Sequence, residues 1–178
     1  MQCEVFFRKE YIMKKLTSLD FSVAILAGVS CLFMYIDVPV WALFVGWAWY
    51  FALGSKPELI GKSIPPLIAG SVLAAAAFEL IDLFGKFMPS MPATIIAVVI
   101  TVFLLMLTLK IPAMSLSLIS FNAYSCLFVG YANGTYMHFD GIPALLNAAI
   151  YIALANFIGV LFGYISIKIT TVFDKKNA

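Results

Sequence analysis

The chain has 178 residues, of which 63% are hydrophobic and only 11% are charged. A soluble domain of this length leaves much of its surface in water and cannot cover so many apolar side chains, so we expect an integral membrane protein with lipid as its solvent. The net charge of +2, without a basic tract interleaved with aromatic residues, argues against a nucleic-acid binder.

Six apolar stretches follow one another along the chain, separated by short breaks such as Asp37-Val38-Pro39. Runs of about 17 to 25 apolar residues cross a bilayer core of roughly 30 Å, and a backbone in hydrocarbon must satisfy its own hydrogen bonds. Each stretch therefore predicts a helix, the second being short and the sixth being closed by Lys168. The expected spans are residues 21–36, 39–53, 64–85, 93–109, 112–132 and 142–167. The predicted fold class is an all-α membrane protein with six transmembrane helices.

Lysine and arginine are concentrated in alternate connections between these spans. Of the 11 such residues, all but Lys86 precede the first span, lie in the second or fourth connection, or follow the sixth span. Because short cytoplasmic loops are enriched in Lys and Arg, both termini are expected in the cytoplasm. Five or seven spans would scatter these charges over both sides of the membrane, so the same bias favours six.

The expected domain organisation follows from these spans. A cytoplasmic N-terminal tail covers residues 1–18, the six-helix transmembrane domain covers residues 19–168, and a cytoplasmic tail covers residues 169–178. Met13 is a second candidate for the start of the protein, in which case residues 1–12 are a dispensable tail.

The two halves of the transmembrane domain, about 19–88 and 92–168, share a pattern. At a constant offset of 78 residues, eight of 22 positions are identical between segments 64–85 and 142–163, including the Leu-Phe-Gly that ends each. Pro39, the first residue of the second span, likewise matches Pro112, the first residue of the fifth.

Three spans per half is an odd number, so the halves would face opposite ways, as inverted repeats do in channels and secondary transporters. The alternative is that the two segments match by chance, because apolar helices are built from few residue types.

Polar residues inside spans are costly in hydrocarbon and usually face protein or water, so they are the best pointers to a pathway. Asn122 on the fifth span and Asn156 on the sixth fall near mid-membrane, with Thr101 and Ser71 as further candidates. Asparagine both donates and accepts hydrogen bonds, which suits a neutral polar solute or water better than a naked ion. The alternative for each residue is a bond between helices, worth about 0.6 kcal/mol.

Glu79 and Asp82 lie three residues apart on one face of the third span, toward its outer end. Glu79 could couple protons, attract cations at a vestibule, or pair with Lys86. We favour the vestibule or capping role, because only Glu79 sits more than one turn inside the apolar boundary. His138 and Asp140, in the outer loop before the sixth span, are too few for a metal site and are interpreted as turn residues.

Small residues predict close helix packing at Gly159 and Gly163, a GxxxG pair on the sixth span, and at Gly70 on the third. Their partners lie either within the chain or in a second copy, and we expect a homo-oligomer. The second span is rich in aromatic residues, which we interpret as interfacial anchors and lipid or partner contacts rather than a ligand box. These aromatic residues are Trp41, Trp47, Trp49 and Tyr50.

No catalytic pattern is present: the chain lacks HExxH, GxSxG, a phosphate-binding glycine loop and an intramembrane Ser with a His. We therefore expect no enzymatic activity. The cysteines Cys3, Cys31 and Cys126 are an odd number without a CxxC motif, which indicates free thiols and no metal or other cofactor. A lipoprotein leader ending at Cys31 is rejected, because Gly28 stands where a lipobox has a branched aliphatic residue.

The second span resembles a signature of the YcdZ-like family of small bacterial inner-membrane proteins, known as domain of unknown function 1097. The matching residues are Trp41, Phe44, Gly46, Tyr50, Phe51 and Ala52, with a looser match at Tyr124, Tyr131, Ala132 and Gly134. The chain departs from the family pattern at Cys126, where the family tends to have Gly, and at Asn122, where a Pro-Gly pair is common. The resemblance implies a compact multi-span protein of a bacterial inner membrane and implies no activity.

These observations favour a small channel or permease for a small polar solute, embedded in the lipid bilayer as a multi-pass protein. The rival hypothesis is a non-transporting assembly or accessory subunit, in which the same polar residues only pack helices.

Overall fold

The computed structural model describes residues 16–177. Within this range the protein is all α-helical, without a β-strand. The helices are α1 (Ser18–Ser30) with its 3-10 continuation η1 (Cys31–Ile36), α2 (Val40–Ala52), α3 (Glu58–Lys62), α4 (Ile64–Gly85), α5 (Ser90–Thr108), the 3-10 helix η2 (Pro112–Met114), α6 (Ser117–Ala132) and α7 (Ala144–Asn177).

Four helical segments of the described chain are long and apolar enough to cross a membrane, compared with the six spans that the sequence predicts. They are Ser18–Ile36, Glu58–Gly85, Ser90–Thr108 and Ala144–Asp174. Helices α2 and α6 are shorter, with 13 and 16 residues. At 1.5 Å per residue they are about 20 and 24 Å long, against a hydrocarbon core of roughly 30 Å. Six complete crossings therefore stay a prediction.

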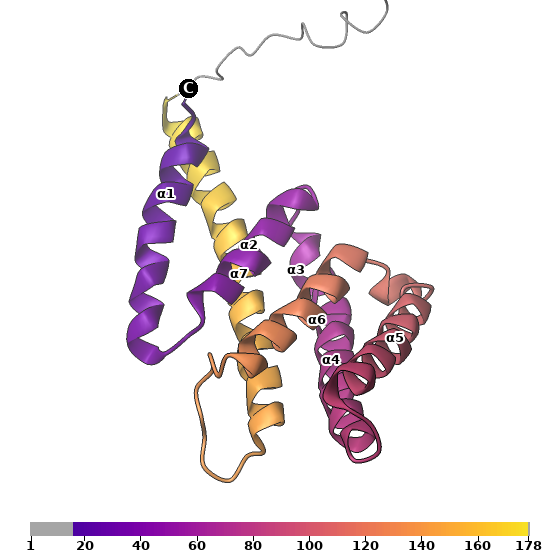
Figure 1. Cartoon of the computed structure of the whole chain (residues 1–178). Helices are drawn as coiled ribbons and strands as arrows, with labels where there is room; N and C mark the ends of the chain where they lie inside the picture. The colour runs from indigo at the N-terminus through magenta and orange to yellow at the C-terminus, as the bar shows by residue number, and fades with distance from the viewer. Residues whose placement is uncertain (1–15, 178) are drawn as a thin grey trace, which may run out of the picture.

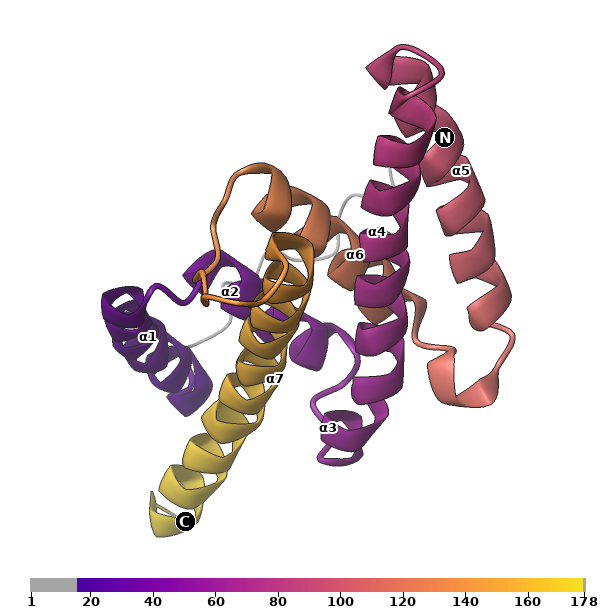
Figure 2. The same ribbon diagram turned by 90° about the horizontal axis from the view of Figure 1, so that it is seen from below.

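The two halves of the chain are interleaved. Helices α1 and α7 lie side by side at one edge, α4 and α5 form a pair at the other, and α2 and α6 lie between the pairs (Figure 1, Figure 2). Thus α1 and α2 of the first half pack on α7 of the second, whereas α5 and α6 of the second half pack on α4 of the first. Each half therefore completes the core of the other.

The start of α1 and the end of α7 meet at one end of the molecule. Ser18 Oγ donates a hydrogen bond to Asp174 Oδ1 at 2.6 Å, and Ser22 Oγ donates to the carbonyl of Ser166 at 3.1 Å. The α1–α2 turn and the α6–α7 loop lie at the opposite end (Figure 1). This arrangement of the two ends is compatible with an even number of crossings.

Glycines allow α2 and α7 to approach closely. A Cβ atom on Gly46 would overlap the backbone carbonyl of Asn156, and one on Gly159 would overlap the carbonyl of Leu43. Gly163 continues the contact one turn further along α7, where a Cβ atom would lie 2.8 Å from the side chain of the α2 residue Tyr50. Both residues of the GxxxG pair therefore face a helix of the same chain.

A second close approach joins α4 to α6. A Cβ atom on Gly70 would overlap the carbonyl of Ser120 and lie 3.0 Å from Ala123 Cβ. The structure thus places Gly70, Gly159 and Gly163 at the two crossings that hold the short central helices against the long ones.

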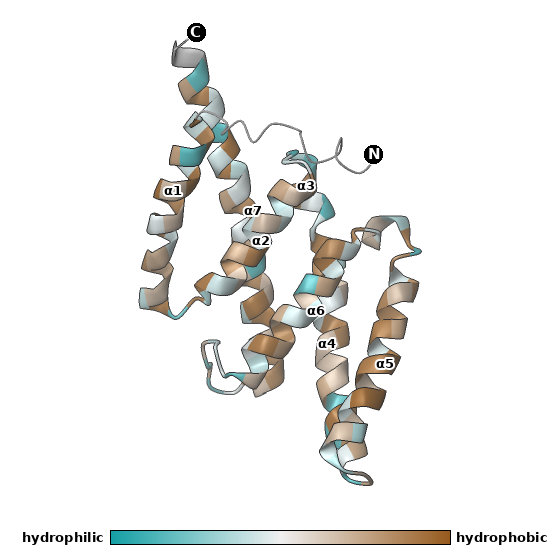
Figure 3. Ribbon diagram, turned by 45° about the horizontal axis from the view of Figure 1, so that its top comes forward, coloured by the Kyte–Doolittle hydropathy of each residue, from teal (hydrophilic) through white to brown (hydrophobic). Residues whose placement is uncertain are grey.

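The aromatic residues of α2 belong to the core, which corrects the interpretation of this helix as a set of interfacial anchors. Trp47, Trp49 and Tyr50 are 3%, 2% and 1% exposed, and only Trp41 is half-buried. Because α2 is short and lies between longer helices, its large side chains fill the space between α4, α6 and α7. The lipid-facing apolar surface is instead provided largely by α1 and α5, where hydrophobic residues cover the ribbons in Figure 3.

Two predicted helix boundaries are wrong, namely the start of α6 and the end of α7. Helix α6 begins at Ser117 rather than at Pro112, because the hydroxyl of Ser115 bonds back to the Pro112 carbonyl in a separate 3-10 turn. Pro39 directly precedes α2, so it is not equivalent to Pro112.

Helix α7 does not end at Lys168 but continues to Asn177. The Lys168 ammonium lies 5.5 Å from the Tyr164 ring centre, and a long cationic side chain that reaches the interface is compatible with a continuing helix. The predictions for Cys3, Met13 and the first 15 residues of the N-terminal tail lie outside the described residues.

Candidate functional site

Asn156 is a buried residue of α7 whose side-chain amide makes no full hydrogen bond and has the weakly bonding Cys126 thiol of α6 beside it. It is 0% exposed, and neither its amide oxygen nor its amide nitrogen is bonded in the structure. It sits on α7 where Gly46 brings the backbone of α2 into contact. A buried amide without a full hydrogen bond lowers the free energy of unfolding by roughly 1 to 3 kcal/mol, so this residue destabilises the protein if its role is purely structural.

Among the described residues, three more buried polar groups without a hydrogen-bond partner lie on α2 and α6, namely the indole Nε1 of Trp47, that of Trp49, and the Ser120 hydroxyl. Trp49 on α2 packs in one cluster with Ile119 of α6 and Val160 of α7, and its indole Nε1 has no partner. The Ser120 hydroxyl is also buried and unpaired, next to Ile119 in the chain. Val160 lies one turn beyond Asn156 on α7, so three helices bring donors and acceptors into one region of the core.

Thr101 is placed differently, because its hydroxyl is fully engaged. Thr101 Oγ1 donates a hydrogen bond to the Ala97 carbonyl at 2.8 Å. It also forms a hydrogen bond of 2.8 Å with Tyr124 Oη, in which either hydroxyl could be the donor. This contact ties α5 to α6 inside the core, as the alternative of a bond between helices describes.

Asn122 does not share a cavity or a hydrogen bond with Asn156 in the described structure. Its Nδ2 donates to the carbonyl of Leu118, one turn earlier on α6, and the residue is only half-buried. The two asparagines that the sequence places at similar depth are therefore separate in their contacts.

Ser71 and Glu79 come together in a groove between α4 and α7. The groove has a volume of about 510 Å³ and is otherwise lined by Ala and large aliphatic residues and by Pro143. Asn156 does not line it. Of the five predicted pathway residues, Ser71 and Glu79 thus line the same groove. Asn122, Asn156 and Thr101 lie in three other places.

A cavity of about 620 Å³ with mixed polar and apolar lining, which we name the vestibule, opens at the end of the molecule opposite the start of α1 and the end of α7, and Glu79 does not line it. Its lining includes Asp37, Trp41, Tyr136 and His138. The centres of the Tyr136 and His138 rings lie 4.5 Å apart, and burial raises the pKa of the Tyr136 phenol further above its ordinary value.

The floor of the vestibule approaches Asn156. A Cβ atom on Gly130 of α6 would lie 3.4 Å from the Trp41 ring and would overlap the side chain of Ile152. Ile152 is one helical turn from Asn156 on α7. Trp41 and Ile152 are thus the side chains between the vestibule and the unpaired amide.

Sequence reasoning missed the vestibule, since it treated Asp37 as part of a break and His138 as a turn residue. A signal for the central helices was nevertheless available. The segment Leu-Phe-Val-Gly-Trp-Ala at 43–48 in α2 recurs as Leu-Phe-Val-Gly-Tyr-Ala at 127–132 in α6, with five of six residues identical. Both copies carry the glycine that meets α7, Gly46 and Gly130.

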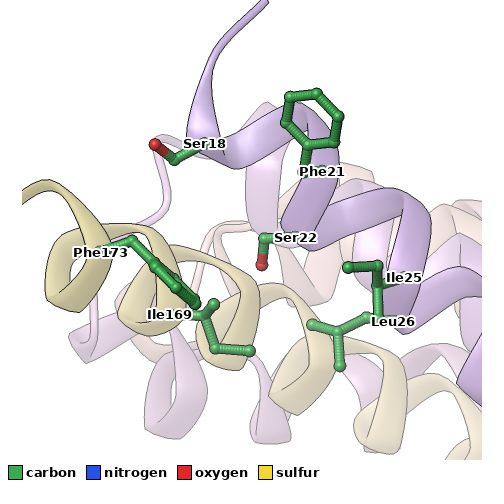
Figure 4. A pocket seen from close by; sticks show the side chains of 7 residues that line it. All are labelled: Ser18, Phe21, Ser22, Ile25, Leu26, Ile169 and Phe173. Carbon is green, nitrogen blue, oxygen red and sulfur yellow. The ribbon is translucent and has the colours of Figure 1, made fainter.

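An apolar pocket of about 420 Å³ lies between α1 and α7 near the two chain ends (Figure 4). Ile25 and Leu26 of α1 and Ile169 and Phe173 of α7 line it, and the ring of Phe21, also in the lining, points away from α7. The hydroxyls at its edge belong to Ser18 and Ser22, and both are already bonded to α7. The pocket therefore offers apolar contact and little polar recognition.

No group of three or more His, Cys, Asp or Glu side chains that could hold a metal ion occurs among the described residues. Cys31 is an exposed free thiol, and Cys126 is a buried one. The described part of the chain thus offers no built site for a metal.

Comparison with known proteins gives a family and no activity. No curated protein and no solved structure matches the chain. The model of a family described as "Protein of unknown function (DUF1097)" matches residues 21–171, which include every helix from α2 to α6 and most of α1 and α7. The chain therefore belongs to the DUF1097 family of proteins of unknown function.

Proposed function

We propose that the protein is a channel or permease for a small, neutral, polar solute and that Asn156 forms part of its pathway. The observation that carries this proposal is the Asn156 amide, which is fully buried in an apolar helix and makes no full hydrogen bond, with the weakly bonding Cys126 thiol beside it. An unpaired amide in this position is costly, and a solute or water that reached it would supply the missing hydrogen bonds. The arrangement described above is then a closed state, because Asn156 is 0% exposed in it.

The proposed route runs from the vestibule to the centre. Solute enters beside Asp37 and His138, passes Trp41 and Ile152, and meets the Asn156 amide. The buried groups that we assign to the end of this route are the Asn156 amide, the Ser120 hydroxyl and the Trp49 indole N–H, and all of them are neutral. Neutral donors and acceptors suit a neutral solute better than an ion, which would need compensating charge.

The interleaved packing supports an inverted repeat. Exchanging the halves maps α1 on α5, α2 on α6 and α4 on α7, and the main contacts of α7 with α1 and α2 become those of α4 with α5 and α6. The repeated segments 43–48 and 127–132 follow the same correspondence. In transporters built this way, short or interrupted helices form the site near the midplane, and we assign that role to the short helices α2 and α6.

The same proposal puts both chain ends in the cytoplasm of a bacterial inner membrane, with six crossings and the vestibule outside. The bias of Lys and Arg and the contact between Ser18 and Asp174 support it. Self-association, if it accompanies transport, would use lipid-facing surfaces, because Gly159 and Gly163 are already covered by α2. The proposal includes no enzymatic step.

Solute flux into liposomes tests the function. The purified full chain is reconstituted, and swelling is followed by stopped-flow light scattering with urea and polyols of increasing size. We expect flux above that of empty liposomes, with a size cut-off, and a loss of at least tenfold in Asn156→Leu. Thr101→Val, a buried polar residue whose hydroxyl is already paired, should retain flux. Flux equal in Asn156→Leu and the unaltered protein would overturn the role of Asn156.

The accessory-subunit hypothesis has one observation in its favour, namely the complete burial of Asn156. It predicts no flux above empty liposomes for any of the solutes, together with a stable complex with another membrane protein after mild detergent extraction. Flux that depends on Asn156 excludes it.

A further inference from the structure

The groove between α4 and α7 runs along most of α4 and is open at the surface of the molecule. Two adjoining cavities of about 510 and 290 Å³ form it, and Ile68, Ile150 and Ala153 line both. Ile68 is 54% exposed and Ile150 is 48% exposed, so molecules dissolved in the lipid can reach the groove directly. Alanines on both walls, such as Ala75 and Ala149, leave room between the helices.

Glu79 is the one charged residue among those that line this groove. Its side chain is exposed, and it precedes the end of α4 at Gly85 by six residues, or about 9 Å along the helix axis. If α4 ends at the membrane surface, as we propose, Glu79 lies below the lipid headgroups. No Lys, Arg or His lines either cavity to compensate the carboxylate. The groove therefore combines a long apolar wall with an acidic group at depth.

Two obvious occupants fit this combination badly. A second copy of the chain, packed groove against groove about a twofold axis, would bring two Glu79 carboxylates toward each other without a counter-charge. A phospholipid that laid an acyl chain in the groove would place its phosphate, an anion, nearest to the carboxylate. A molecule with a positive charge attached directly to an apolar body avoids both conflicts.

We propose that the groove binds a lipophilic organic cation, with the apolar body between α4 and α7 and the positive charge beside Glu79. The volume of about 510 Å³ lies within the range of roughly 300 to 1,000 Å³ of small-molecule sites. A delocalised or shielded charge loses little hydration on entering an apolar groove, whereas its attraction to a carboxylate is strong at low dielectric constant. Inorganic cations and primary ammonium ions are disfavoured by the same reasoning.

Tetraphenylphosphonium and tetraphenylborate test the proposal, because the two ions have nearly the same shape and opposite charge. Binding to the full chain in nanodiscs is measured by isothermal titration calorimetry. We expect saturable binding of one tetraphenylphosphonium per chain and none of tetraphenylborate. Glu79→Gln should weaken the binding at least tenfold. Asp82→Asn, which removes a carboxylate one turn away that does not line the groove, should leave it unchanged.

A second variant keeps the test valid if Glu79→Gln fails to fold. Ala153→Phe inserts a ring where the two cavities join and leaves the carboxylate in place, so it should abolish tetraphenylphosphonium binding. Equal binding of the two ions, or full binding in Glu79→Gln, would overturn the proposal. Glu79 could instead have only a structural role beside the first turn of α7, which lines the same groove. In that case Glu79→Gln lowers the melting temperature and leaves tetraphenylphosphonium binding intact, which contradicts the proposal.

Two further measurements separate this site from others. Native mass spectrometry that showed a phospholipid retained at the groove, resistant to excess tetraphenylphosphonium and lost in Ala153→Phe, would count against a cation site. Asn156→Leu should bind tetraphenylphosphonium as the unaltered protein does, since Asn156 does not line the groove. The test of the cation site is therefore independent of the test of solute flux.

Discussion

Two buried polar sites in the same helix bundle differ in whether their groups are paired. At the α5–α6 contact, the Thr101 hydroxyl lies 2.8 Å from both the Tyr124 hydroxyl and the Ala97 carbonyl. At the α2–α7 crossing, the Asn156 amide makes no full hydrogen bond and has only a weakly bonding group, the Cys126 thiol, recorded beside it. A paired polar residue in a membrane helix holds helices together, whereas an unpaired one indicates a place that another molecule completes. Polarity and depth in the sequence do not distinguish the two.

The largest effect is expected from Gly46→Ala, which tests whether the Asn156 site depends on the close approach of α2. The added Cβ atom would overlap the backbone carbonyl of Asn156, and neither backbone can move away without separating the helices. We expect a loss of about 3 kcal/mol in the free energy of unfolding, at the upper end for overpacking. Unfolding in mixed micelles by SDS titration measures it.

Gly28→Ala provides the matched control, because a Cβ atom at Gly28 of α1 meets no atom within 4 Å. Alanine there should be neutral or stabilise the protein by roughly 0.5 to 1 kcal/mol, through its higher helix propensity. Similar losses in both variants would mean that the α2–α7 contact is looser than described and that Asn156 is not held in place by it.

The second prediction concerns the sign of the change at the two polar sites. Asn156→Leu keeps the branching of the side chain and removes two unpaired polar atoms, so it should stabilise the protein by about 1 kcal/mol. Thr101→Val removes a paired hydroxyl and leaves the Tyr124 hydroxyl buried without this partner, so it should destabilise by about 1 kcal/mol. The same SDS titration measures both.

Asn156→Val, with a smaller side chain, separates polarity from volume at this site. If Leu destabilises and Val does not, the extra volume of Leu is responsible. If both substitutions destabilise, the amide has a bonding partner in the membrane, and the contrast between the two sites disappears.

Much of the helix layout could be predicted from the sequence. The start and end of α4 agree with the expected span, because Pro at its first turn and Lys86 after Gly85 delimit the apolar run. α2 was expected to be short, and it has 13 residues. The end of α7 could not be predicted from Lys168, because a charge limits how far lipid can cover a helix and does not end its hydrogen bonding.

The contacts of the site residues were beyond the reach of the sequence. The partner of Thr101 is 23 residues away on another helix, so the spacing of apolar residues carries no information about it. Burial of Trp47 and Trp49 depends on α2 lying between longer helices, which follows from the interleaving of the two halves. The vestibule likewise forms only when the α1–α2 turn meets the α6–α7 loop.

The smallest effect is expected from Tyr124→Phe, which sharpens the description of the paired site. Without the Tyr124 hydroxyl, Thr101 still donates to the Ala97 carbonyl at 2.8 Å, so no buried group loses its last partner. The cost should therefore be about 0.6 kcal/mol, the average for a bond between membrane helices, and below that of Thr101→Val. The reverse order would show that Tyr124, rather than Thr101, is the residue with further partners, because truncating one member of a pair costs most when the other is left unbonded.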